Sequence, residues 1–173
     1  MTTGAANERI ASIARQAVAE LAPHELPRFR ATREAYFRNP DQLLAAPRGK
    51  EEMLGFGPTE AGLFLSPLVL QVTAVLTFST SVDAGRLQGA AEAVGSLVAT
   101  SLVREIVRDV FQRAGGVDRL QQIGSQVTRD QLRQLRRLVL ALERARDAGM
   151  QERQAEQVVD TVASHASASA PRE

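Results

Sequence analysis

Cysteine and tryptophan are absent from this 173-residue sequence, and aromatic residues make up only 4% of it. The absence of cysteine excludes disulfide bonds, thiolate metal sites and thiol catalysis, and it agrees with a reducing compartment. With six phenylalanines and one tyrosine, the hydrophobic core must be built mainly from leucine, valine, alanine and isoleucine. Such side chains suit helix-on-helix packing better than packed β-sheets.

A strong net charge is also missing. The 21 basic and 20 acidic residues give a formal net charge of +1, so no overall field draws the protein to nucleic acid or anionic lipid. The first twenty residues include Glu8, Arg9, Arg15 and Glu20 and therefore lack the uninterrupted apolar stretch of a secretory signal. We expect a cytoplasmic protein, with membrane association as the alternative.

Helical periodicity, by contrast, is abundant. Apolar residues recur at spacings of three and four in regions 10–21 and 132–142, which places them on one face of a helix. Thr128 followed by Gln131 has the pattern of a capping box, and Gly149 is placed to end the helix that follows. We predict an all-α fold, a bundle of about six helices around a long central antiparallel helical hairpin.

Proline and glycine mark the expected boundaries. Residues 39–41, Asn-Pro-Asp, predict a turn, and the two glycines at 115–116 predict a helix stop. Segment 46–58 mixes proline, glycine and charge, which is the composition of a connector. We predict a single helical domain over residues 1–164, followed by a disordered tail of alanine and serine at 165–173.

The run from Ala61 to Val82 contains no charged residue. At about 1.5 Å per residue, a helix of this length reaches the roughly 30 Å thickness of a bilayer's hydrocarbon core. Pro67, Gln71 and several hydroxyl residues dilute its apolar side chains, however. We interpret the run as the buried axis of a bundle, with membrane insertion as the alternative.

A second long helix is expected to follow, capped by Asp83 and ending near Arg113. Its first half is rich in glycine and alanine, and such small residues let helix backbones approach closely. We therefore expect the central pair of helices to mediate self-association or to bind another helical protein. The predicted contact residues are Gly85, Gly89, Ala93, Leu65 and Leu68.

Three arginines, Arg129, Arg133 and Arg136, share one face of a later helix. Phosphate-binding helices carry this pattern. Asp130 lies among the arginines, however, and no nucleic-acid-binding motif is recognisable. We include the three arginines as candidate interaction residues, and binding of nucleic acid is the second alternative function.

No catalytic residue, cofactor or metal site is predicted. The only two histidines, His24 and His165, lack the local partners of a nucleophile or a metal site. Segment 55–62 has the glycine density of a phosphate loop, but Leu63 and Phe64 stand where that loop needs Lys and Ser or Thr. We predict a non-enzymatic interaction or scaffold protein whose partner, process and oligomer number the sequence leaves open.

Overall fold

The computed structural model describes residues 2–45, 65–81, 89–112, 115–125 and 127–169. Within these ranges the chain forms eight α-helices, a 3₁₀ helix and no strand, so the predicted all-α class is confirmed. The elements in chain order are α1 (Thr2–Leu21), the 3₁₀ helix η1 (Pro23–Glu25), α2 (Leu26–Arg38), α3 (Pro40–Ala45), α4 (Leu65–Ser81), α5 (Gly89–Gln112), α6 (Gly115–Ile123), α7 (Arg129–Asp147) and α8 (Glu152–Ala168).

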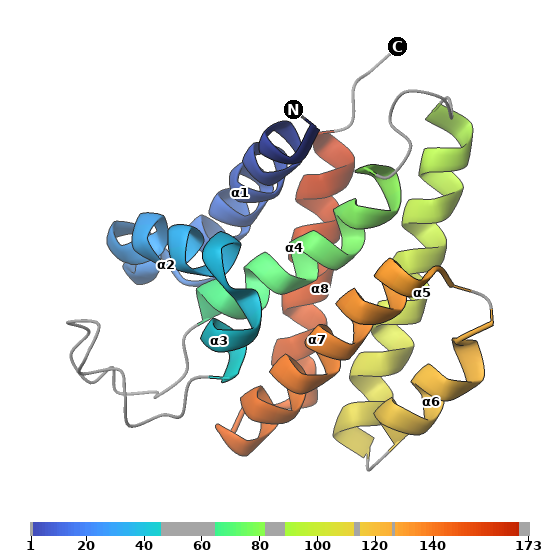
Figure 1. Ribbon diagram of the computed structural model, residues 1–173. Helices are drawn as coiled ribbons and strands as arrows, with labels where there is room; N and C mark the ends of the chain where they lie inside the picture. Colours follow the sequence, from blue (N-terminus) through green and yellow to red (C-terminus); the bar gives the residue numbers. More distant parts are fainter. Residues whose placement is uncertain (1, 46–64, 82–88, 113–114, 126, 170–173) are drawn as a thin grey trace.

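Helix α4 lies at the centre of the molecule (Figure 1) and contacts α1, α2, α3, α5, α7 and α8. Residues 68–77 of this helix are all buried. A helix that neighbours cover on every side carries apolar residues around its whole circumference, so the uncharged run supplies an internal helix. None of the helices in the described ranges combines the length and the apolarity that crossing a membrane requires.

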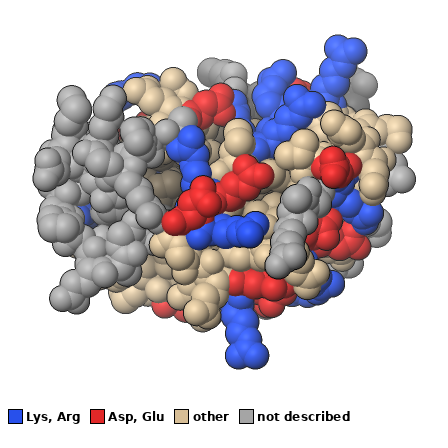
Figure 2. Space-filling model, turned by 90° about the horizontal axis from the view of Figure 1, so that it is seen from below, with Lys and Arg blue, Asp and Glu red and all other residues tan. Residues whose placement is uncertain are grey.

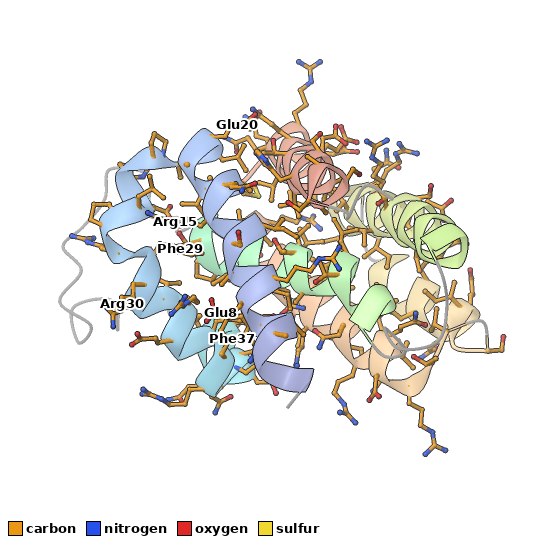
Figure 3. The ribbon with its side chains drawn as sticks, turned by 90° about the horizontal axis from the view of Figure 1, so that it is seen from above. Glu8, Arg15, Glu20, Phe29, Arg30 and Phe37 are labelled. Atoms are coloured by element: carbon orange, nitrogen blue, oxygen red, sulfur yellow. The ribbon has the colours of Figure 1, made fainter. Side chains whose placement is uncertain are left out.

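Helices α1 and α8 pack against α4 and against each other. The periodic residues of α1 form its inner face, where Ile13, Ala17 and Val18 are fully buried. Figure 3 shows α1 extending toward α8, so that Glu20 lies beside it. There His165 Nε2, near the end of α8, lies 3.0 Å from Glu20 Oε2, near the end of α1. This contact links the two helices.

Helix α8 continues through Ala168, four residues past 164, so the predicted disordered tail begins too early. Ala163 and Ala166 pack against the core. The hydroxyl of Ser167 donates a hydrogen bond to the carbonyl of Ala163 at 2.9 Å. These contacts, together with the pairing of His165, hold residues that composition alone assigned to a tail.

The helix boundaries confirm some of the predicted helix caps and turns. Thr128 and Gln131 form the predicted capping box at the start of α7, with the Gln131 amide 3.2 Å from the Thr128 hydroxyl. Gly149 follows α7 with a φ of +91°, a left-handed conformation that favours glycine. Asn39 ends α2 as expected. The residues after it, however, form the short helix α3, because the Asn39 Oδ1 atom accepts a hydrogen bond from the Gln42 amide at 3.1 Å.

Helix α5 ends at Gln112, close to the predicted end near Arg113, and the two glycines at 115–116 lie in the first turn of the next helix, α6. Gly116 also has a packing role. A Cβ atom at this position would lie 2.8 Å from Val110 Cγ2 and 3.4 Å from Val139 Cγ1. Glycine therefore allows α6 to approach both α5 and α7 closely.

The described residues form more helices than the predicted bundle of about six. Helix α5, the expected second helix of the hairpin, contacts α6, α7 and α8 in addition to α4. The connector 46–58 and the predicted cap Asp83 lie outside the described residues.

Candidate interaction surface

A chain of side-chain hydrogen bonds crosses the core from α2 through α4 to α7. The Tyr36 hydroxyl donates to Gln71 Oε1 at 2.7 Å, and Gln71 Nε2 donates to Gln134 Oε1 at 3.2 Å. Burial raises the pKa of the Tyr36 phenol well above its ordinary value, against the lowering effect of Arg137 and with a smaller raising effect from Asp41. Both polar ends of the Gln71 amide are thus bonded inside the chain, and this network joins helices.

The second buried polar group is the Glu25 carboxylate of η1, which is 3% exposed. It accepts hydrogen bonds from the Leu65 and Ser66 amides, both at 2.8 Å, and from the Ser66 hydroxyl at 2.5 Å. A carboxylate at a helix N-terminus satisfies free amides and complements the helix dipole. Glu25 is therefore a long-range cap of α4. Sequence reasoning missed it because about 40 residues separate it from the helix that it caps.

In these two clusters the hydrogen-bonding groups point at one another and link separate elements of the fold. In the part of the chain that the structure describes, no group of acidic and histidine side chains is arranged to hold a metal ion.

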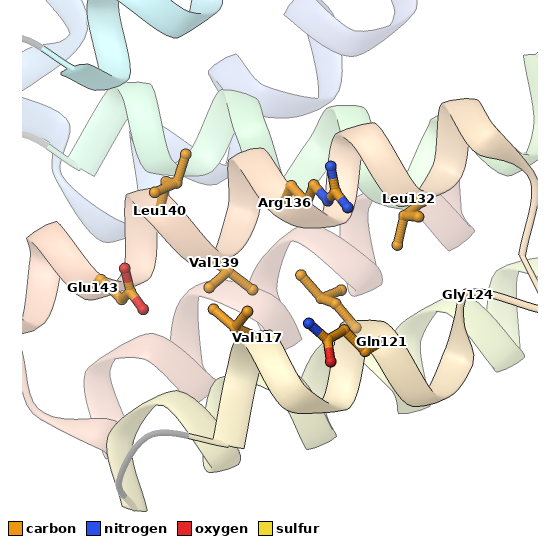
Figure 4. Close-up of a pocket in the computed structure, with 9 residues that line it drawn as sticks. Val117, Gln121, Gly124, Leu132, Arg136, Val139, Leu140 and Glu143 are labelled. Atoms are coloured by element: carbon orange, nitrogen blue, oxygen red, sulfur yellow. The ribbon is translucent and has the colours of Figure 1, made fainter.

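An apolar groove lies on the surface between α6 and α7 (Figure 4), with a volume of about 450 Å³. Its polar lining is sparse and includes Arg136 and Glu143. Val117 of α6 and Leu140 of α7 line it and are each 54% exposed. The groove is lined by Val117, Leu120, Gln121, Gly124, Leu132, Arg136, Val139, Leu140 and Glu143.

Local sequence explains how the groove forms. The inner face of α7 buries Leu135, Leu138 and Leu142 against the core, and the helical period turns Leu140 outward. Gly116 brings the start of α6 close to Val139. Two neighbouring helices thus present one exposed apolar side chain each at the same groove.

The predicted site residues fall in different places. Arg129, Arg133 and Arg136 are exposed on α7, and Arg136 lines the groove. Leu65 is half-buried and Leu68 is buried in the core. The other predicted contact residues are Gly89 and Ala93, which belong to α5, and Gly85, which lies outside the described residues.

Sequence reasoning missed Val117 and Leu140 as surface residues. The sequence does indicate that Leu140 is exposed, because it falls beside the apolar stripe of α7. A single exposed leucine is ordinary. It forms part of a candidate surface only because a second exposed apolar residue, Val117, lies on a neighbouring helix.

The charges near the groove are mixed in sign. Glu143 and Asp147 are exposed on the same helix as the three arginines. On the face of the molecule in Figure 2, basic and acidic side chains are interspersed and do not form one continuous basic surface.

Comparison with known protein families, with curated proteins and with solved structures finds no match to this chain.

Proposed function

We propose that this chain is a non-enzymatic interaction protein that binds an amphipathic helix of a protein partner in the groove between α6 and α7. The observation that carries the proposal is the pair Val117 and Leu140, each 54% exposed on different helices and lining one groove. Covering such side chains stabilises a complex by about 25 cal/mol per Å² of apolar area removed from water. A helix whose apolar face fills a hydrophobic groove is a recurrent mode of peptide recognition.

The central helical pair is less well placed to serve as the contact surface. Residues 68–77 of α4 are buried by the chain's own helices, so they offer no area to a second molecule. In this proposal the α4–α5 hairpin remains the core of the bundle. The α6–α7 groove takes the role of the interface that the sequence assigned to the hairpin.

The absence of cysteine provides a clean test. A Val117→Cys variant has a single thiol, which carries an environment-sensitive fluorophore into the groove. A matched Gln157→Cys variant places the same label at an exposed position on α8. Both labelled proteins are titrated with a designed amphipathic helix bearing one leucine stripe, and with a peptide of the same composition whose stripe is scrambled.

We expect a saturable blue shift for the label at 117 with the striped peptide, and none with the scrambled peptide or with the label at 157. A further Leu140→Glu substitution should abolish the shift, because it introduces a charge into the groove. The label at 117 is also titrated with an excess of the unlabelled protein. A fluorescence spectrum that changes neither with the striped peptide nor with the unlabelled protein would overturn the proposed function.

A further inference from the structure

We propose that the helix held by this groove is α7 of a second copy of the chain, in an antiparallel, two-fold symmetric pair. The inference rests on the proposed function, that the α6–α7 surface binds a helix, and adds the identity of that helix. It is carried by the order of charges along the exposed face of α7.

Six residues of α7 form one exposed stripe, spaced by four, three, four, three and four positions. This spacing keeps side chains on one side of a helix, as in the contact seam of a coiled coil. Three basic residues come first, then one leucine, then two acidic residues. The stripe consists of Arg129, Arg133, Arg136, Leu140, Glu143 and Asp147.

The stripe maps onto itself when a second α7 is laid against it in the opposite direction. Arg129 then faces Asp147 of the other copy, and Arg133 faces its Glu143. The two-fold axis repeats both pairs at the other end. A parallel arrangement would place arginine against arginine and acid against acid, which is unfavourable. The charge order thus selects the antiparallel arrangement.

The middle of the stripe contributes the apolar part of the contact. In the same register, Leu140 of each copy faces Arg136 of the other. Arg136 lines the groove (Figure 4), and its aliphatic stem is able to cover a leucine while the guanidinium stays in water. Leu140, which is 54% exposed in one copy, is thereby brought to the groove of the other.

The charged side chains of the stripe are available for such pairing. Arg129, Arg136, Glu143 and Asp147 form no ion pair with any other described residue. Arg133 Nη1 lies 3.5 Å from Asp130 Oδ1, an exposed pair three residues apart. Such a pair contributes little and exchanges readily. The same charges would otherwise remain solvated.

The size of the contact predicts its strength. A helix of 19 residues is roughly 28 Å long, so one helix pair flanked by α6 buries an area at the low end of specific interfaces. We expect a reversible dimer whose dissociation constant is in the micromolar range or above, of the order of 10 μM. The dimer should weaken about tenfold between about 50 mM and 500 mM salt, since exposed charges are screened.

A pair of charge-reversal variants tests the register. The acidic-stripe variant carries Arg129→Glu and Arg133→Glu, and the basic-stripe variant carries Glu143→Arg and Asp147→Arg. The acidic-stripe variant places acidic residues near the N-terminus of α7, and the basic-stripe variant places basic residues near its C-terminus. Both changes suit the helix dipole, so the fold should persist, and circular dichroism checks this. The control, Arg9→Glu with Arg153→Glu, makes the same change in net charge as the acidic-stripe variant, at exposed positions on other helices.

Sedimentation equilibrium measures the outcome. Each stripe variant alone should lose at least about tenfold in dimer affinity through like-charge repulsion, whereas the control should dimerise like the natural chain. An equimolar mixture of the two variants should form a heterodimer at least as stable as the natural dimer, because every acid then faces an arginine. A purely structural role for these residues would not produce recovery on mixing.

The possible failures separate the two proposals. A natural chain that stays monomeric at about 1 mM would overturn the second-copy inference. In that case, a shift in the fluorescence spectrum of the label at position 117 with the striped peptide would still support the binding of a helix in the groove. Dimers unaffected by either stripe variant would place the self-contact elsewhere and overturn the antiparallel register. No shift with either partner would overturn both proposals.

Discussion

Helices α4 and α7 differ in where their polar side chains find partners. In α4, Gln71 bonds to Tyr36 and Gln134, and the Thr73 hydroxyl donates to the Val69 carbonyl at 2.7 Å. All of these groups are enclosed by the chain. Along the outer face of α7, the charged residues are exposed, and most of them form no ion pair with another residue that the structure describes.

The difference indicates what each helix does. A buried polar group destabilises the fold unless it is hydrogen-bonded, so the polar residues of α4 are part of the packing. Exposed charges are under no such constraint. Their order on α7, next to the exposed Leu140, is the basis of the contact with a second molecule that we propose.

The largest effect is expected from truncating a buried side chain of α4. Leu70 of α4 is fully buried, and Leu70→Ala should lower the free energy of unfolding by about 2–5 kcal/mol through lost burial and a cavity. Urea denaturation measures the loss. A cost below about 1 kcal/mol would mean that α4 is less tightly enclosed than we describe.

The cap of α4 gives the next largest effect. Glu25→Ala removes the acceptor of the Leu65 and Ser66 amides and the Ser66 hydroxyl, and should cost about 3 kcal/mol because charged hydrogen bonds are lost and donors are left unpaired. Thermal unfolding followed by circular dichroism measures it. Glu25→Gln retains one acceptor and should lose less, whereas equal losses would show that bulk alone matters at this position.

A smaller loss is expected from the core network. Tyr36→Phe removes the hydroxyl that bonds to Gln71, leaves a buried acceptor unpaired, and should cost about 1–2 kcal/mol at neutral pH. Chemical denaturation of the two proteins under identical conditions measures this difference.

The same substitution tests the sign of a pH dependence. Since burial raises the folded-state pKa of Tyr36, the contribution of the neutral phenol is fully present below about pH 10, the ordinary pKa, and is lost as the pH rises above it. The natural chain should therefore lose stability relative to Tyr36→Phe above pH 10, by at most about 1.4 kcal/mol per pH unit. Parallel curves for the two proteins between pH 9 and 11 would contradict the buried position of the phenol.

The smallest effect on folding is expected at the outer face of α7. Leu140→Ser should change the free energy of unfolding by no more than about 0.5 kcal/mol, because the side chain is already largely in water. The same variant should weaken binding at the groove. A large loss of stability would show that Leu140 belongs to the core, and would remove the contrast between the two helices.

Much of the local structure could be predicted from the sequence. The capping box at Thr128 depends on two residues three positions apart, and the turn at Gly149 depends on the freedom of one glycine. The apolar stripes of α1 and α7 reflect the helical period alone. Features of this kind are encoded within one or two helical turns.

The errors arose where distant segments meet. The tail after residue 164 has the composition of a disordered end, but Glu20 of α1 lies within 3.0 Å of His165. The glycines at 115–116 follow the end of α5 as expected, but the close approach of Gly116 to Val139 of α7 was not predicted. Neither partner could be identified from the residues beside it in sequence.

By itself, the sequence determined the all-α class, most helix starts and ends, and the absence of thiol chemistry, because these follow from residue type and short-range periodicity. Only the tertiary structure decided that Glu25 caps α4, that Gln71 bonds across the core, and that Val117 and Leu140 line one groove. These relations depend on which faces of separate helices pack together. That choice is made by long-range burial of apolar surface, which no local pattern specifies.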